Sequence, residues 1–411
     1  MSKLHIPKVS QIRTTAIQLP SSKSISNRAL IINALAGGQS NIDNLSEARD
    51  TKTMLKLLNS QETELDVLDA GTTMRFLTAY LTSTNQQKVL TGTPRMQERP
   101  IKILVDALKQ IGGEISYIKN EGYPPMRIDG LPTQKSSQIK ISGDVSSQYI
   151  SALLMIAPTL PEGLTLEITG KIGSRPYIEM TLAMMKHFGV TSSWEDNRIT
   201  IAPQSYTSVP FDVEPDWSGA SYWYSWVSLS ECDELFLTRL KDQSLQGDRR
   251  MADIMEKLGV HSDFREDGVS LTKIESASSV EIDFSDCPDL AQTVAVICAV
   301  KGIKCTMTGL ESLRIKETDR IAALQNELAK IGARIDEKEN LWELTPADDK
   351  DSPVVSPIDI HTYEDHRMAM AFAPLATLTD IIIDDSTVVQ KSYPGYWSDL
   401  ELAGIKVLSI D

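Results

Sequence analysis

Leu328-Ala329-Lys330-Ile331-Gly332 is one copy of a phrase that decides how this chain is organised. The phrase consists of an apolar residue, two variable residues, a second apolar residue and a glycine, and alternating polar and apolar residues follow it. Two apolar residues one turn apart with a glycine behind them are typical of a helix that ends in the left-handed conformation. The alternation predicts a strand. Each copy is therefore expected to be a helix that leads into a strand.

The phrase recurs along the chain at a regular interval of 70 to 77 residues. Its copies end at Gly112, Gly189, Gly259, Gly332 and Gly404. A weaker sixth copy ends at Asn59, and asparagine is the residue that next best tolerates the left-handed conformation. The period is longer than that of solenoid repeats and indicates six larger modules.

Each module also begins with an earlier helix. Six stretches open with small or acidic residues, which are good N-cap residues, and continue with an apolar run. They are S-S-K-S-I-S-N-R-A-L-I-I at 21–32, D-A-G-T-T-M-R-F-L at 69–77, D-V-S-S-Q-Y-I-S-A-L-L at 144–154, D-W-S-G-A-S-Y-W at 216–223, D-C-P-D-L-A-Q-T-V at 286–294 and E-D-H-R-M-A-M-A-F at 364–372. Two helices per module with intervening strands predict an α/β protein of two similar domains, each with three βαβαββ repeats.

A junction between the domains is expected near residue 215, where V-P-F-D-V-E-P-D-W at 209–217 carries two prolines. The first nineteen residues precede the first module, and we expect them to pair with the distant half. In R-I-K-E-T-D-R at 314–320, the apolar spacing that follows predicts a helix that begins at 318–320, with Thr318 or Asp319 as its cap.

Composition excludes several classes of protein. A formal charge of −15 argues against a non-specific nucleic-acid binder, because affinity for the phosphate backbone comes from clustered Lys and Arg. Four cysteines without a C-x-x-C pair predict reduced thiols in a cytoplasmic protein. The longest apolar stretch, 149–160, is shorter than the roughly 18 residues of a membrane span, so no membrane association is expected.

Polar clusters gather where the first helices begin. They lie at 20–28, 69–75, 91–100, 143–148, 174–177, 286–289, 364–367 and 390–394. Each cluster alone also fits a capped surface helix or a solvated loop. Together they recur at equivalent ends of repeated modules, which predicts a cleft lined with Lys, Arg and hydroxyl groups for a ligand with several phosphates or carboxylates. Carboxylates beside such a ligand are better explained as proton-transfer groups.

These motifs resemble the 5-enolpyruvylshikimate-3-phosphate synthase family of enolpyruvyl transferases. The resemblance rests on P-S-S-K-S-I-S-N-R-A-L, D-A-G-T-T-M-R, T-P-R-M-Q-E-R-P, G-D-V-S-S-Q, R-I-K-E-T-D-R, D-H-R-M-A-M and K-S-Y-P, which occur in order between about 19 and 396. It implies an enolpyruvyl transferase fold, an inside-out α/β barrel with the active site in the interdomain cleft. It also implies one discontinuous domain, 1–19 with 215–411, and one inserted domain, 20–214.

The resemblance further implies two substrates and their ligands. Shikimate 3-phosphate would contact Lys23, Ser24, Arg28, Ser146, Ser147, Ser174, Tyr177, Asp289, Ser312 and Lys316. Phosphoenolpyruvate would contact Lys23, Gly71, Arg95, Gln148, Arg320, Arg367 and Lys391. The enolpyruvyl group would pass to the ring 5-hydroxyl through a tetrahedral intermediate, with loss of phosphate.

The implied catalytic set is Lys23, Asp289, Glu317, His366 and Lys391. Within it we assign Asp289 to the 5-hydroxyl proton, and Glu317 with Lys23 to the methylene and the leaving phosphate. No metal or organic cofactor is required, and a monomer is expected. Three residues depart from the commonest family pattern: Ser21 for Gly, Asp69 for Asn and Ser312 for Asn. Asp69 should repel phosphoenolpyruvate unless it caps the helix or pairs with an arginine.

Two other functions remain open. A sibling enolpyruvyl transferase acts on UDP-N-acetylglucosamine, but that family carries a reactive cysteine in its first half, whereas all four cysteines here follow residue 230. A silent anion-binding homologue would not need the carboxylates.

Overall fold

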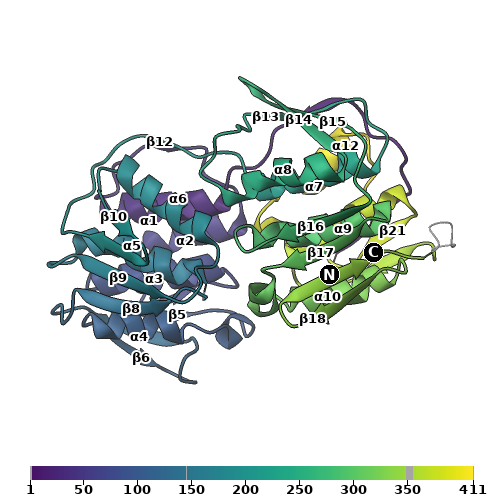
Figure 1. Ribbon diagram of the computed structural model, residues 1–411. Coiled ribbons are helices and arrows are strands. Elements are labelled where there is room, and N and C mark those ends of the chain that lie inside the picture. Colours follow the sequence, from purple (N-terminus) through teal and green to yellow (C-terminus); the bar gives the residue numbers. More distant parts are fainter. Residues whose placement is uncertain (1, 145, 349–354, 411) are drawn as a thin grey trace. The chain divides into compact units, whose positions relative to one another are not determined.

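The computed structural model of the protein describes residues 2–144, 146–348 and 355–410 (Figure 1). The chain forms two compact units. We call residues 1–20 with 214–411 the discontinuous unit, and residues 21–213 the inserted unit. The boundaries expected from the sequence lie one residue from these. Among the helices of the described chain, none has the length and apolar character of a membrane span.

One repeat of the discontinuous unit shows the module in full. Its elements are β16 (Ser279–Asp283), α9 (Ala291–Lys301), β17 (Lys304–Thr308), α10 (Arg320–Ala329), β18 (Arg334–Lys338) and β19 (Leu341–Thr345). β16 and β17 are parallel, and β19 pairs antiparallel with both β17 and β18. The sheet order is therefore β16-β17-β19-β18, which is the βαβαββ pattern that the sequence predicts.

The other two modules of this unit are completed by strands from the beginning of the chain. One contains β2 (Thr15–Ile17), α7 (Trp217–Leu229), β13 (Leu235–Thr238), α8 (Met251–Leu258), β14 (Val260–Arg265) and β15 (Gly268–Lys273). The other contains β20 (Ile358–Ile360), α11 (His366–Phe372), β21 (Ile381–Ile383), α12 (Tyr396–Leu402), β22 (Leu408–Ile410) and β1 (Lys3–Ile6). β2 is parallel to β13, and β1 lies between β21 and β22. The expected pairing of the first residues with the second half is therefore confirmed.

The inserted unit contains two full modules and one reduced module. The full modules are β4 (Glu64–Asp66), α3 (Gly71–Ser83), β5 (Lys88–Thr91), α4 (Lys102–Gln110), β6 (Glu114–Tyr117) and β7 (Met126–Gly130), and β8 (Gln138–Ser142), α5 (Ser147–Ile156), β9 (Leu164–Thr169), α6 (Arg175–His187), β10 (Ser193–Glu195) and β11 (Arg198–Ile201). The reduced module has α1 (Lys23–Leu35), α2 (Arg49–Leu58) and a two-stranded sheet of β3 (Ile42–Asp43) and β12 (Phe211–Asp212). It lacks the final hairpin among its described residues, so the expectation of three complete repeats here is wrong in that detail.

The ends of the second helices follow the repeated phrase, with one exception. Each of the five glycines has a positive φ, for example 97° at Gly259 and 77° at Gly332. Asn59 caps α2 with φ −96°, so the left-handed conformation expected there is wrong. The reduced module needs no turn into a hairpin strand, which removes the demand for that backbone geometry.

The first helices of the modules form the core of each unit. In the discontinuous unit α7, α9 and α11 contact one another, and nearly every residue of these helices is buried. In the inserted unit α1, α3 and α5 likewise contact one another. Helices that are apolar on all sides must be buried in this way. Their N-termini then bring the polar stretches at the starts of three helices to the same end of each core.

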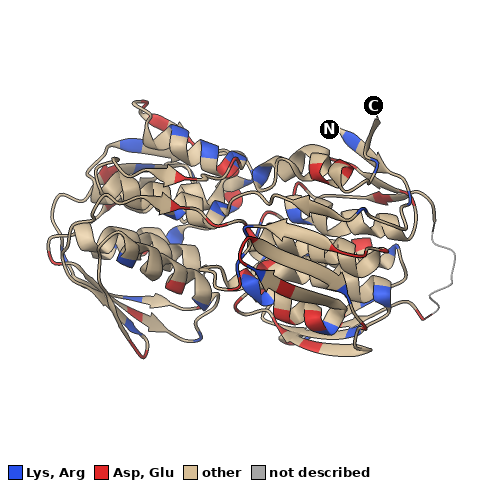
Figure 2. Ribbon diagram, turned by 90° about the horizontal axis from the view of Figure 1, so that it is seen from above, with Lys and Arg blue, Asp and Glu red and all other residues tan. Residues whose placement is uncertain are grey.

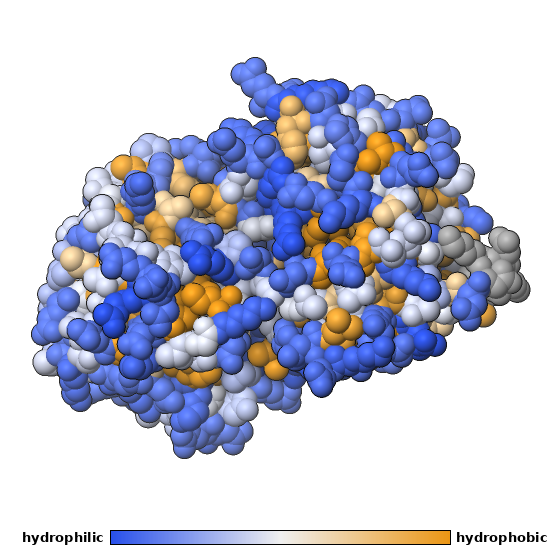
Figure 3. Space-filling view, viewed as in Figure 1, coloured by the Kyte–Doolittle hydropathy of each residue, from blue (hydrophilic) through white to orange (hydrophobic). Residues whose placement is uncertain are grey.

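The surface of both units is mixed in character. Lys and Arg are interspersed with Asp and Glu over each unit (Figure 2). Hydrophilic residues cover most of the face in Figure 3, with apolar residues in small patches. Among the described residues, the view of Figure 2 shows no extended surface of one charge sign, and we turn to the buried charges.

Candidate active site

Arg28 is the most deeply buried cation of the inserted unit. It is 1% exposed, and its guanidinium donates to Thr181 Oγ1 at 2.7 Å, to Ser151 Oγ at 3.1 Å and to the carbonyl oxygen of Ser24 at 3.0 Å. Among the described residues no carboxylate forms an ion pair with it. Burial lowers the pKa of Arg28 to about 10, against a small opposing effect of Tyr177. The inserted unit therefore holds a positive charge that only neutral groups solvate.

Lys23 opens the same helix, behind the N-cap Ser22. Its ammonium group lies 3.1 Å from Asp50 Oδ2, and both side chains are largely buried. Asp50 comes from the first turn of α2, so the packing of α1 on α2 sets the position of Lys23. Ser24 follows in the first turn, where free amide groups favour anions.

The start of α5 faces the start of α3. Ser146 is the N-cap of α5, and Ser147 and Gln148 form its first turn. Gln148 Nε2 donates to Thr72 Oγ1 at 3.1 Å, which ties the two helix starts together beside Gly71. The predicted site residues Gly71, Ser146, Ser147 and Gln148 are therefore neighbours. Val145, inside the same motif, lies outside the described residues.

Two buried arginines crowd Gly71. A Cβ atom on this glycine would lie 2.4 Å from Arg75 Nη1 and 2.8 Å from Arg99 Nη1. Both guanidinium groups therefore occupy the space that a side chain would take. Neither arginine is among the predicted site residues. Arg95, which is among them, is 42% exposed at its side chain and pairs with Glu98 at 3.1 Å on its own loop.

Asp69 is neutralised by an arginine. Arg49 Nη2 lies 2.8 Å from both oxygens of Asp69, and the N-cap of α3 is Ala70. Asp69 was expected to avoid repelling phosphoenolpyruvate either by capping the helix or by pairing with an arginine. The structure shows the pair with an arginine and not the cap.

Ser174 and Tyr177 lie at the start of α6, the helix that also carries Thr181. Ser174 has φ 53° and ψ 41°, a left-handed conformation that costs a non-glycine residue energy and is often retained at functional sites. The Arg28 guanidinium lies 5.8 Å from the centre of the Tyr177 ring. Tyr177 therefore lies beside Arg28, and Ser174 lies at the N-terminus of the same helix.

In the discontinuous unit, Arg320 is a hub for three carboxylates. It is 1% exposed, and it donates to Asp365 at 2.7 Å, to Asp289 at 2.9 Å and to Glu317 at 3.0 Å. Burial opposes the charge of Arg320, but the three carboxylates outweigh that effect and raise its pKa above the ordinary value. The side chain that was predicted to hold phosphoenolpyruvate therefore also contacts Asp289 and Glu317, the two carboxylates that were predicted to transfer protons.

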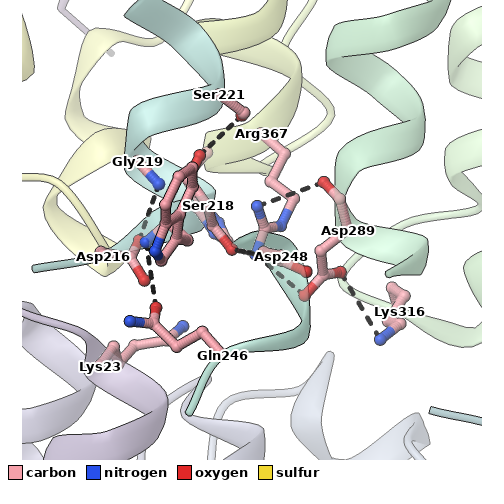
Figure 4. A network of polar contacts seen from close by, with 12 residues as sticks. Lys23, Asp216, Ser218, Gly219, Ser221, Gln246, Asp248, Asp289, Lys316 and Arg367 are labelled. Carbon is pink, nitrogen blue, oxygen red and sulfur yellow. Dashed lines mark hydrogen bonds and ion pairs between the residues drawn. The ribbon is translucent and has the colours of Figure 1, made fainter. Parts of the chain in front are cut away.

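Asp289 is surrounded by cations (Figure 4). Its Oδ2 atom accepts from Arg367 Nη2 at 2.9 Å, and its Oδ1 atom lies 3.7 Å from Lys316 Nζ. Burial pushes the pKa of Asp289 upward, yet the charges of Arg367, Lys316 and Arg320 prevail and hold it well below the usual range. Burial also lowers the pKa of Lys316. As it stands, Asp289 is an ionised carboxylate and a weak base.

The remaining predicted residues lie around the same hub. Lys391 is 1% exposed, and its Nζ lies 3.9 Å from Glu317 Oε1. His366 is buried at the start of α11, with Nδ1 3.6 Å from Asp365 Oδ1. Ser312 is half-buried in a 3₁₀ turn, Glu311–Ile315, which precedes Lys316.

The segment at 314–320, R-I-K-E-T-D-R, supplies both the N-cap of α10 and part of the charged cluster around Arg320. Asp319 is the N-cap of α10 and accepts from the amides of Ile321 and Ala322 at 3.1 Å each. Arg314 pairs with Asp319 at 3.0 Å and also with Glu337. The prediction that Thr318 or Asp319 caps this helix is confirmed, and the cap is Asp319.

Several hydrogen-bond partners of the predicted site residues could not be identified from the sequence. Asp50, Ser151 and Thr181 hold Lys23 and Arg28, but they lie 27 to 153 residues away in the chain and carry no motif. Asp365 was visible beside His366, yet nothing distinguished it from an ordinary cap. No cluster of three His, Cys, Asp or Glu residues that could hold a metal occurs in the described part of the chain.

Comparison with known proteins identifies the family. Residues 8–64 and 57–400 match the family model "EPSP synthase (3-phosphoshikimate 1-carboxyvinyltransferase)". A 3-phosphoshikimate 1-carboxyvinyltransferase of Bacteroides fragilis is 50% identical over 404 residues, which is 97% of each chain. A protein of the same name from a Sulfurovum species is 39% identical over 94% of this chain and 95% of its own.

A solved structure shows the same fold. EPSP synthase from Acinetobacter baumannii matches with a TM-score of 0.81, covers 100% of both chains and shares 19% sequence identity. At that identity the likeness concerns the fold alone.

Proposed function

The chain belongs to the EPSP synthase family, and on that premise we propose that it transfers the enolpyruvyl group of phosphoenolpyruvate to the 5-hydroxyl of shikimate 3-phosphate and releases phosphate. This is a step of aromatic amino-acid biosynthesis by the shikimate pathway. The observation that carries the proposal for this chain is Arg28. A buried guanidinium with only neutral partners has its charge balanced when an anionic group, such as a phosphate, binds beside it.

We assign the binding of shikimate 3-phosphate mainly to the surroundings of Arg28. Ser24, Ser146, Ser147, Ser174 and Tyr177 supply hydroxyl and amide donors there. Lys23, Asp289, Ser312 and Lys316 complete the set. Phosphoenolpyruvate would be held by Gly71, Arg95, Gln148, Arg320, Arg367 and Lys391, together with Lys23.

Asp289 is the proposed base for the ring hydroxyl. Its low pKa, which Arg367, Lys316 and Arg320 impose, makes it a weak base in the free protein. Anionic substrate groups on those cations cancel part of their charge, so the pKa of Asp289 rises toward the value that proton transfer needs. The base would then become effective only when substrate is bound.

Glu317, with Lys23, would protonate the methylene and the leaving phosphate. Support comes from the position of Glu317 between Arg320 at 3.0 Å and the buried Lys391 at 3.9 Å. Lys391 and the buried His366 complete the proposed catalytic set. Orientation of the two anions supplies the rest of the rate, up to roughly 7–11 kcal/mol.

One experiment tests the proposal directly. The protein is mixed with shikimate 3-phosphate and phosphoenolpyruvate, and released phosphate is measured, with UDP-N-acetylglucosamine as the competing acceptor. Release with shikimate 3-phosphate alone supports the proposal. Release with only the nucleotide sugar favours the sibling activity, and release with neither leaves a silent anion-binding protein. The cytoplasmic location, the monomeric state and the absence of a cofactor stay predictions.

A further inference from the structure

Asp248 is a buried carboxyl group beside Arg367 that the proposed mechanism leaves unused. It lies in a 3₁₀ turn, Gly247–Arg250, and is 3% exposed. Its Oδ2 atom accepts a hydrogen bond from Ser218 Oγ, and Ser218 Oγ in turn accepts from Arg367 Nη2 at 3.3 Å (Figure 4). A single hydroxyl group therefore separates Asp248 from the guanidinium.

Arg367 is shared between two carboxyl groups. The same Nη2 atom donates directly to Asp289 Oδ2 at 2.9 Å. Asp289 has two further cations near it, Arg320 and Lys316. Among the described residues, by contrast, the other oxygen of Asp248, Oδ1, has no hydrogen-bond partner. A buried carboxylate oxygen without a donor is unfavourable, so this environment favours the neutral acid.

On balance, the charged and titratable groups around Asp248 also favour its neutral acid form. Burial and then the charge of Asp289 raise the pKa of Asp248 to about 7, while Arg367 and the Ser218 hydrogen bond lower it, and Asp216 raises it a little. Cys287 also interacts with it, but burial raises the pKa of that thiol to about 12 and keeps it neutral at pH 7. Arg367 is thus the cation that favours the charged form of Asp248.

An anion that binds Arg367 would cancel that favourable charge. Without that charge, the carboxylate form of Asp248 becomes less stable relative to the protonated acid. We propose that Asp248 is a positioning residue that takes up a proton from solvent when an anionic group of a substrate binds Arg367, so that negative charge does not accumulate behind the site. The proton returns to solvent when the anion leaves. This inference rests on the proposed function, which places phosphoenolpyruvate on Arg367.

Calorimetry measures the uptake directly. Phosphoenolpyruvate is titrated without shikimate 3-phosphate, in two buffers that differ in ionisation enthalpy, into the unaltered protein and into Asp248→Asn. At pH 7 the unaltered protein should take up about 0.5 proton more than the variant, because a group with a pKa near 7 is half ionised there. Ionisation of phosphoenolpyruvate itself contributes equally to both. Equal uptake by the two proteins would overturn the inference.

The pH profile separates this role from a structural one. For the unaltered protein kcat/KM for phosphoenolpyruvate, corrected for substrate ionisation, should fall as pH rises through about 7, and Asp248→Asn should lose that step. Asp263→Asn is a matched control, because Asp263 is exposed and, among the described residues, pairs locally with Arg265 at 2.9 Å. It should keep the profile of the unaltered protein. A variant that lowers kcat and stability but keeps the step overturns the inference.

The test does not depend on the variant folding. If Asp248→Asn is unstable, calorimetry on the unaltered protein from pH 6 to 8.5 decides, and uptake no greater than that of phosphoenolpyruvate alone overturns the inference. Absent turnover would contradict the proposed function. Normal turnover with unchanged proton uptake would contradict only the role of Asp248.

Discussion

Arg49 Nη2 lies 2.8 Å from both carboxylate oxygens of Asp69, two residues before Gly71 begins α3. The pair neutralises a carboxylate that lies close in the chain to Gly71, a proposed ligand of phosphoenolpyruvate. Arg49→Gln should therefore raise the KM for phosphoenolpyruvate, about 3- to 10-fold at low salt, because Asp69 loses the positive charge of Arg49. Asp69→Asn should lower that KM. Because both side chains are partly exposed, stability should change by less than about 1 kcal/mol in either variant.

Steady-state kinetics at 0.02 M and 0.3 M salt measure this effect, which screening should reduce. The KM for shikimate 3-phosphate serves as the internal control. An Arg49→Gln variant with an unaltered KM for phosphoenolpyruvate at low salt would show that the pair is only structural.

Arg28 should contribute to affinity more than to stability. Arg28→Gln removes a buried charge whose partners are neutral, so the KM for shikimate 3-phosphate should rise about 10- to 100-fold, as expected for one charge-assisted contact. The free energy of unfolding should stay equal or increase at pH 7, since the folded state no longer buries that charge. Arg28→Lys keeps the charge and should recover part of the affinity. Urea denaturation together with initial rates tests both, and a large loss of stability without a change in KM contradicts the assignment.

Asp289→Asn should lower turnover about 10²- to 10⁴-fold, the range of a general base. It should also destabilise the fold at pH 7 by about 3–5 kcal/mol, because Arg320, Arg367 and Lys316 lose a common partner. The pKa of Asp289 is depressed in the folded protein, so its stabilising contribution is present above pH 4 and is lost as pH falls through the lower, folded value. The difference in unfolding free energy between variant and unaltered protein should therefore shrink between pH 7 and pH 3. A difference that stays constant would mean that the cations do not act on Asp289.

Asp248→Asn should have the opposite effect on stability. The pKa of Asp248 is raised to about 7, so the folded state holds its proton while the unfolded state releases it, and stability is lost as pH rises from about 4 to 7. The amide side chain introduced by Asp248→Asn does not titrate, so the variant has no such loss of stability. Near pH 8 the variant should therefore be more stable than the unaltered protein by about 1–3 kcal/mol, and the gain should vanish near pH 4. Thermal unfolding at the two pH values measures this gain. The prediction is refuted if the stability of the variant, relative to the unaltered protein, is lower at pH 8 than at pH 4.

The sequence alone determined the modular plan. Regular spacing of the helix-ending glycines and the polar starts of the first helices depend on local backbone preferences, which is why Gly259 and Gly332 adopt positive φ as predicted. The reduced module was harder to foresee, because a missing hairpin leaves the phrase at Asn59 almost intact. The motifs that contain Arg28 and Asp289 could also be recognised in the sequence, because each is a short continuous stretch.

Only the tertiary structure decided which charges meet. Ser151, Thr181 and Asp365 become partners of Arg28 and Arg320 through the packing of different modules, and Asp50 becomes a partner of Lys23 through the packing of two helices of one module. Coulomb interactions depend on distance and burial, which no spacing along the chain reports. For the same reason, the sequence revealed a cluster of mixed charge. Within the described part of the chain, the fold determined that Arg28 pairs with no carboxylate, that Asp289 lies near three cations and that Asp248 contacts none directly.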